Sequence, residues 1–156
     1  MYVKYFKSIT FIQPRGMPPK NTYRDKIQFM KRPKILEDAG FDLYVDTSKL
    51  RDLPLPVEQK KLEELTWCFD FPVWEKDGTD DWNLTPRQVI DKEPGTSEHM
   101  KKVEGSNLEY PIVIIFNKDR WVILDGIHRL VKSYLLKKPT IDVKILSKDS
   151  PYLISK

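Results

Sequence analysis

The clearest pattern of hydrophobic and polar residues lies in the last third of the chain. Residues 110–116 form an almost unbroken apolar run, which predicts a strand that is covered on both faces. The polar residues 117–120 predict a hairpin turn, and the apolar residues 121–124 predict the returning strand. This stretch therefore predicts a buried β-hairpin.

A helix and a further strand follow the hairpin. After Asp125 and Gly126, apolar residues recur at the three- and four-residue spacing of one helical face, which predicts a helix over 127–138 that Pro139 ends. Residues 141–146 alternate between apolar and polar side chains and predict the last strand. We expect the hairpin, this helix and this strand to be the best-defined part of the fold.

The first forty residues have a less regular pattern. Residues 2–12 are rich in aromatic and β-branched side chains and predict a strand, whereas the prolines and glycine of 13–21 predict a loop. Residues 22–39 have helical spacing that Pro33 interrupts, so we expect two short helices or one bent helix. Gly40 is the expected helix stop.

The middle of the chain predicts shorter elements. Residues 41–45 predict a strand, and residues 57–65, which follow two prolines, predict a helix. The Phe-Asp-Phe alternation within 66–74 predicts another strand, which Pro72 would keep at the edge of a sheet. Residues 151–156 predict a loose tail.

Two further helix starts carry capping signals. Thr85 is a good N-cap residue, and Pro86 after it is a good first helical residue, so a short helix is expected to begin here. Thr96 or Ser97 is expected to cap the next helix, which would end at Gly105.

This order of strands and helices predicts an α+β fold with a small mixed sheet, a hairpin and packed helices. We expect one compact domain over residues 41–148, preceded by a basic extension over residues 1–40 and followed by a tail over residues 149–156. The chain has 156 residues, of which 40% are hydrophobic and 32% are charged, as is usual for a globular protein.

Composition narrows the compartment and the chemistry. No apolar run approaches 18 residues, and Lys4 and Lys7 interrupt the apolar start, so we expect no signal peptide and no membrane partner. The single cysteine, Cys68, excludes an internal disulfide and a zinc site made of thiolates. We therefore expect a reducing, cytoplasmic location.

The charges are segregated along the chain. Residues 1–34 hold nine lysines and arginines against one acid, residues 57–94 hold ten acids against five bases, and residues 118–156 hold nine bases against four acids. The basic end regions suit an anionic ligand near the C-terminus and permit a nucleic-acid partner for the N-terminal region. Ordinary solvated lysines explain the N-terminal excess equally well.

The predicted start of helix 127–138 carries three potential cations, His128, Arg129 and Lys132, on one face. A helix N-terminus already carries partial positive charge, so this arrangement is unfavourable unless something negative lies between these side chains. A bound anion would resolve the conflict.

The same residues carry a resemblance. Residues 85–147, and above all the box Asp125-Gly126-Ile127-His128-Arg129, resemble the ParB/sulfiredoxin superfamily, whose members bind nucleotide phosphates at this box. The closest branch is that of the free-serine kinases, with an Asp-Gly-His-His-Arg box, from which this chain differs mainly at Ile127.

Other branches of the superfamily fit less well. Sulfiredoxins have their catalytic cysteine where this chain has Ile127, and Cys68 is far away in sequence, so we expect no sulfinic-acid reduction. Partition-type ParB proteins have a Gly-Glu-Arg-Arg box and continue into a helix-turn-helix domain, for which we expect no room here. The resemblance to ParB-like nucleases is weaker, because no metal-ligand cluster is obvious.

The resemblance implies a phosphate cradle. Main-chain N–H groups from Gly126 to Arg129 would hold the phosphates, with Arg129 gripping the phosphate oxygens and His128 donating a hydrogen bond or a proton. The helix that carries His99 lines the nucleotide site in the superfamily, so the predicted phosphate-binding residues are Gly126, Ile127, His128, Arg129, His99, Lys102 and Ser97. The alternatives are a plain helix start that Asp125 caps, and a surface position for His99.

The candidates for catalysis are Asp125 and His128 in the box, and Asp70 or Glu75 as general base in the acidic stretch. Asp125 would either cap the helix or act beside the transferred phosphoryl group and help to hold magnesium. Trp74, next to Glu75, would either pack in the core or contact the ligand. We expect no zinc site, because two histidines without thiolates would need carboxylates at a spacing that is not apparent.

Three functions remain open at this point. The first is a nucleotide-binding protein that uses ATP or another nucleotide with magnesium, as a phosphotransferase towards a small molecule or protein, or as a nucleotide hydrolase. The second is a ParB-like nuclease or a nucleotide-gated DNA-binding module. The third is a binding module that keeps the phosphate cradle without turnover.

Overall fold

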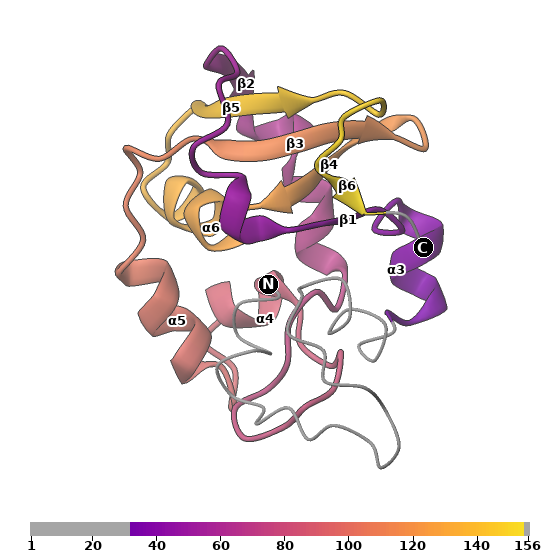
Figure 1. Ribbon diagram of the computed structural model, residues 1–156. Coiled ribbons are helices and arrows are strands. Elements are labelled where there is room, and N and C mark those ends of the chain that lie inside the picture. Colours follow the sequence, from indigo (N-terminus) through magenta and orange to yellow (C-terminus); the bar gives the residue numbers. More distant parts are fainter. Residues whose placement is uncertain (1–31, 155–156) are drawn as a thin grey trace.

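The computed structural model describes residues 32–154 (Figure 1). The predictions for residues 2–31 lie outside the described residues. In chain order, the elements are α3 (Lys34–Ala39), β1 (Tyr44–Val45), the 3₁₀ turn η1 (Thr47–Lys49), β2 (Glu58–Lys61), the 3₁₀ turns η2 (Leu62–Glu64) and η3 (Thr66–Asp70), α4 (Pro86–Ile90), α5 (Ser97–Glu104), β3 (Ile112–Asn117), β4 (Arg120–Asp125), α6 (Ile127–Leu135), β5 (Thr140–Leu146) and β6 (Leu153–Ile154).

The main sheet has the strand order β2-β5-β3-β4, and it confirms the predicted α+β class with a small mixed sheet. Strands β3 and β4 form the expected antiparallel hairpin, whose turn residues Lys118 and Asp119 have φ values of 49° and 62°. These positive values match the right-handed twist of the two strands. Strand β5 follows α6 and pairs with β3 in parallel, so the connection between these two parallel strands runs through β4 and α6.

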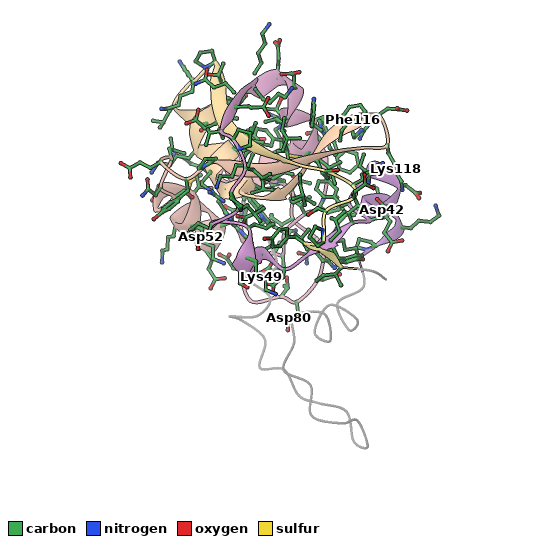
Figure 2. The ribbon with its side chains drawn as sticks, turned by 45° about the horizontal axis from the view of Figure 1, so that its top comes forward. Asp42, Lys49, Asp52, Asp80, Phe116 and Lys118 are labelled. Carbon is green, nitrogen blue, oxygen red and sulfur yellow. The ribbon has the colours of Figure 1, made fainter. Side chains whose placement is uncertain are left out.

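Strand β3 is covered on both faces, as predicted. Residues 112–115 are at most 1% exposed, and only Phe116, near the hairpin turn, is largely exposed, at 49%. Figure 2 shows Phe116 at the same end of the molecule as Lys118 and Asp42. Ile112, at the start of β3, lies close to Gly126 at the beginning of α6.

The predicted loose tail is wrong for Leu153–Ile154, because these residues pair antiparallel with β1. Arg32 holds the segment that leads into β1, because its guanidinium donates hydrogen bonds to the carbonyls of Phe41 and Leu43. Burial lowers the pKa of Arg32 to about 10. Helix α3, expected to belong to an extension over residues 1–40, packs with the rest of the fold in one core.

Two predictions for the middle of the chain are wrong. Residues 57–65 do not form a helix, because Glu58–Lys61 pair with β5 along the edge of the sheet. Residues 66–74 do not form an edge strand: Thr66–Asp70 form η3, which buries the adjacent residues Cys68 and Phe69. In both places long-range packing overrides the local pattern.

The helix boundaries agree better with the sequence. Thr85 caps α4 in a reciprocal capping box with Gln88, and Gly40 ends α3 with a φ of 115°, both as predicted. Helix α5 ends at Gly105 as expected, and Thr96 occupies the predicted N-cap position, but its side chain makes no capping hydrogen bond. Helix α6 stops three residues early, because Lys137 takes a φ of 57°.

Candidate functional site: a histidine pair at the start of helix α6

The predicted box lies where β4 passes into α6. Gly126 is the N-cap residue with a φ of 113°, and it has no side chain with which to cap this end of the nine-residue helix. A Cβ atom on Gly126 would lie 2.5 Å from Cγ2 of Ile112 and 3.0 Å from Nη2 of Arg129. Glycine is therefore required here by both conformation and space.

Asp125 is not the helix cap that one alternative proposed. Its Oδ2 accepts a hydrogen bond from Nη2 of Arg129 at 2.9 Å, in an ion pair that is 12% exposed on the arginine side and 26% on the aspartate side. Nη1 of the same arginine donates to the carbonyls of Tyr110 and Pro111 at 3.0 and 2.9 Å. Arg129 thus ties the start of α6 to the segment that leads into β3.

The other cations of this helix face also have partners within the protein. Nζ of Lys132 donates to the carbonyls of Glu104 and Ser106 at 2.9 and 2.7 Å, next to the C-terminus of α5. His128 meets a second histidine. The charge conflict inferred from the sequence is answered by these internal acceptors, so the conflict alone does not call for a bound anion.

The two histidines of the chain lie edge to edge. Nδ1 of His99, on α5, and Nε2 of His128, on α6, are 2.9 Å apart, and the ring planes differ by only 9°. A hydrogen bond in the plane of both rings therefore joins the two helices. His99 is completely buried, which overturns the alternative of a surface histidine.

Trp74 forms a floor under both histidines. Its ring centroid lies 4.5 Å from that of His99 and 4.5 Å from that of His128, at interplanar angles of 12° and 13°. The backbone of Trp74 is held by an isolated bridge to Leu84, and its side chain is fully buried. Trp74 therefore packs in the core and contacts the candidate site at the same time.

Glu75 extends the arrangement on the other side of His99. Its Oε2 lies 3.6 Å from Nε2 of His99, and the residue is only 1% exposed. Asp70, the other candidate base, has a side chain that is 68% exposed and pairs with Arg87 at 3.3 Å. Of the two acids, the structure brings Glu75 to the histidines and leaves Asp70 in a separate surface pair.

The remaining predicted residues lie on α5. Ser97 donates its hydroxyl hydrogen to Oδ2 of Asp77 at 2.6 Å, and Asp77 also accepts the main-chain N–H of Glu98. Asp77, which the sequence did not single out, therefore supplies the missing cap of α5 from a distant loop. Lys102, one turn after His99, is half-buried.

The stacking role of Trp74 and the link between Glu75 and His99 were also missed. In the sequence, Trp74 and Glu75 are simply neighbours, and this does not reveal which helix their side chains face.

Thiol and metal chemistry receive no support from the described residues. Cys68 is fully buried, and burial raises the pKa of its thiol to about 12, so it is not a nucleophile in the folded protein. Within residues 32–154, no group of three or more histidine, cysteine, aspartate and glutamate side chains is placed to hold a metal ion.

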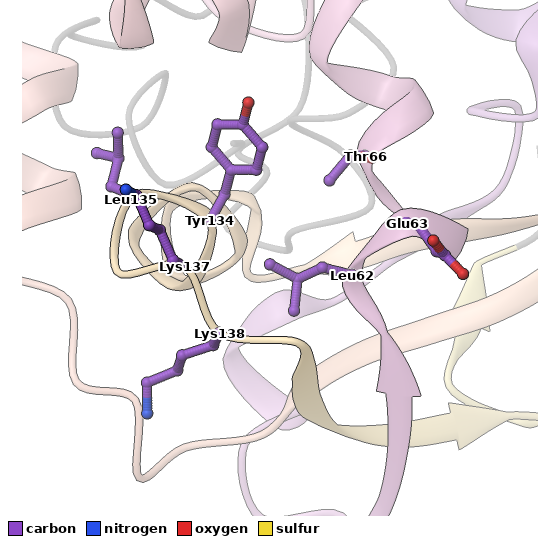
Figure 3. Close-up of a pocket in the computed structure, with 7 residues that line it drawn as sticks. All are labelled: Leu62, Glu63, Thr66, Tyr134, Leu135, Lys137 and Lys138. Atoms are coloured by element: carbon purple, nitrogen blue, oxygen red, sulfur yellow. The ribbon is translucent and has the colours of Figure 1, made fainter.

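A cavity of about 470 Å³ lies at the opposite end of α6 (Figure 3). Tyr134, Leu135 and the two lysines that follow the helix line one side of it, and residues of η2 and η3 line the other. None of the predicted site residues lines this cavity. The histidine pair and the cavity are therefore separate features.

Comparisons of this chain with protein-family models, curated proteins and solved structures found no match. The resemblance to the ParB/sulfiredoxin superfamily therefore stays a prediction. The helices of residues 32–154 include none that is long and apolar enough to cross a membrane.

Proposed function

We propose that this protein binds a nucleotide with its phosphates at the start of α6, and transfers or hydrolyses the terminal phosphoryl group. The observation that carries the proposal is the convergence of His128, His99 and Glu75, from three separate segments, at a helix start that begins with glycine. A helix N-terminus attracts anions through its N–H groups and its dipole. A histidine beside it adds a group that can move a proton.

The box residues have distinct roles in this proposal. The main chain from Gly126 to Arg129 contacts the phosphates, and His128 serves as general acid or base. The side chain of Arg129 is hydrogen-bonded to Asp125 and to two main-chain carbonyls. Its role in this proposal is therefore to fix the shape of the cradle, and it does not bind the phosphates directly. The resemblance of the box to the free-serine kinases supports ATP as the first nucleotide to test, with a small molecule or protein as phosphoryl acceptor.

Magnesium does not fit a site made of protein ligands alone, because the described residues hold no metal-ligand cluster and Asp125 is paired with Arg129. Magnesium that arrives on the nucleotide, held mainly by phosphate oxygens and water, is compatible with this chain. No step of the proposal depends on that ion.

Isothermal titration calorimetry with ATP, ADP, CTP and GTP, with and without magnesium, tests the proposal. We expect one of these nucleotides to bind, and Arg129→Ala to weaken its binding about tenfold, or about 1.4 kcal/mol, because the main chain that contacts the phosphates loses the side chain that fixes its shape. The control is Lys137→Ala, which changes an exposed residue beyond the opposite end of α6 and should leave the affinity unchanged. No binding of any nucleotide would refute the proposal.

Turnover of labelled ATP then separates an enzyme from a binding module. The alternative of a nuclease or a DNA-binding module rests on the basic residues 1–34, of which the structure describes only the last three. No observation on residues 32–154 favours it. Titration with duplex DNA at several salt concentrations tests it, because binding through phosphate contacts weakens steeply with salt.

A further inference from the structure

We propose that Glu75 and His99 act together as positioning residues that fix the tautomer of His128 and make its Nδ1 the proton acceptor of the site. The catalytic part of this inference rests on the proposed function, whereas the tautomer itself is a property of the protein without ligand. His99 lies between the other two side chains, with its Nε2 3.6 Å from Oε2 of Glu75 and its Nδ1 2.9 Å from Nε2 of His128.

The hydrogen bond between the two rings admits two arrangements. A neutral imidazole has one N–H donor and one acceptor nitrogen, so a single proton lies between Nδ1 of His99 and Nε2 of His128. If that proton belongs to His128, then His99 carries its own proton at Nε2, facing Glu75. If it belongs to His99, then Nε2 of His99 presents a lone pair to Glu75.

The buried acid selects between these arrangements. A carboxylate only accepts hydrogen bonds, so it stabilises an N–H group at Nε2 of His99 and repels a lone pair there. The 3.6 Å separation is slightly longer than a hydrogen bond, as catalytic contacts often are before substrate binds. His99 therefore accepts the proton of His128 Nε2–H, and His128 is left with its acceptor lone pair on Nδ1.

This direction has a chemical consequence for phosphoryl transfer. As the acceptor oxygen forms its bond to the terminal phosphorus, its O–H bond breaks and the proton moves to Nδ1 of His128. The bond from phosphorus to the bridging oxygen breaks, and its electron pair leaves with the nucleoside diphosphate. The positive charge that forms on His128 is stabilised through His99 by the carboxylate of Glu75.

Trp74 contributes to the same outcome. Because both imidazoles stack on one indole, they share a plane, and the hydrogen bond between them keeps its alignment. The negative face of the indole also favours an imidazolium over a neutral ring. A buried glutamate, two coplanar histidines and their aromatic floor thus all stabilise a proton on the pair.

Nitrogen-15 NMR of protein labelled at histidine tests the tautomer directly, because the chain has only two histidines. We expect His99 to carry its proton at Nε2 and His128 to carry its proton at Nε2. A scalar coupling across the hydrogen bond should connect Nε2 of His128 with Nδ1 of His99. A proton on Nδ1 of His99, the state that a protonated Glu75 would favour, overturns the inference whatever the activity.

Two variants link the tautomer to function. Glu75→Gln keeps the size of the side chain but removes its charge, and we expect at least a tenfold loss of turnover with nucleotide affinity changed less than twofold. The control is Glu104→Gln, an exposed acid on the same helix as His99, which should change neither quantity. Unchanged turnover in folded Glu75→Gln protein would refute the positioning role.

The two proposals fail in different ways. If no nucleotide binds although the tautomers are as expected, the proposed function is wrong and the proton arrangement stands. If a nucleotide binds and turns over although His99 is protonated at Nδ1, the proposed function stands and the positioning role is wrong.

Discussion

Replacing Gly126 by alanine should disrupt the start of α6 more than any ordinary glycine-to-alanine change. The residue has a φ of 113°, and a left-handed backbone costs an alanine about 1–2 kcal/mol. The new Cβ would lie 2.5 Å from Cγ2 of the fully buried Ile112, and overpacking of this kind costs about 1–3 kcal/mol more. We therefore expect a loss of about 2–5 kcal/mol in the free energy of unfolding, from the sum of these two costs.

Urea unfolding followed by circular dichroism measures this loss, and Gly78→Ala is the matched control. Gly78 also has a positive φ, of 76°, but an added Cβ would meet no atom of residues 32–154 within 4 Å. The control should therefore lose only the backbone cost, about 1–2 kcal/mol. If Gly126→Ala is no less stable than Gly78→Ala, the close packing argued for the start of α6 is wrong.

The clash can also be reduced from the other side. Ile112→Ala deletes Cγ2, the atom nearest to the new Cβ, and leaves Cβ of residue 112 at 2.9 Å from it. The lost core packing costs about 2–5 kcal/mol. Because the two changes relieve each other, the double variant should be more stable than the sum of the single losses predicts, by about 1 kcal/mol or more. Simple additivity would show that the contact is not responsible.

Three further outcomes follow from the structure. The thiol of Cys68, with its pKa raised to about 12 by burial, should resist a disulfide reagent in the native protein and react once urea unfolds it; fast native reaction would contradict its burial. Arg129→Ala should lower the free energy of unfolding by about 2–3 kcal/mol, because its carboxylate partner loses a charged hydrogen bond, and a change below about 1 kcal/mol would show that the ion pair is not important. Burial opposes ionisation of Asp42, but hydrogen bonds from Asn117 and Lys118 keep its pKa below the ordinary value. The lowered pKa stabilises the folded state at pH values above the unfolded pKa of about 4, and this stabilisation is lost as the pH falls through the folded pKa. Between pH 7 and pH 3 the wild type should therefore lose more free energy of unfolding than Asp42→Asn. Equal losses would contradict this role.

Much of the local structure was determined by the sequence alone. The hairpin of β3 and β4, the start of α6 after Gly126 and the cap of α4 by Thr85 all depend on residues that are close together in the chain. Apolar runs, glycine conformation and capping side chains act over a few residues, so their outcome is visible in the sequence. The same reasoning placed His128 and Arg129 in the first turn of a helix.

The identity of the strands in the middle of the chain was decided by tertiary structure. Residues 58–61 became a strand because β5 offers an edge to pair with, and η3 formed where Cys68 and Phe69 could both be buried. No local signal distinguishes these outcomes from the helix and the edge strand that the sequence predicted. Pairing partners and the shape of the core are contributed by distant segments.

The candidate site was likewise assembled by long-range contacts. The sequence supplied two histidines and several acids, but only the packing of α5 against α6 over Trp74 brought His99 to His128 and selected Glu75 in place of Asp70. The partners of Arg129 and Lys132 are largely main-chain carbonyls, which every residue has and which no sequence pattern reveals. The positions of the polar residues were therefore readable in the chain, whereas their partners depended on how the chain folds in space.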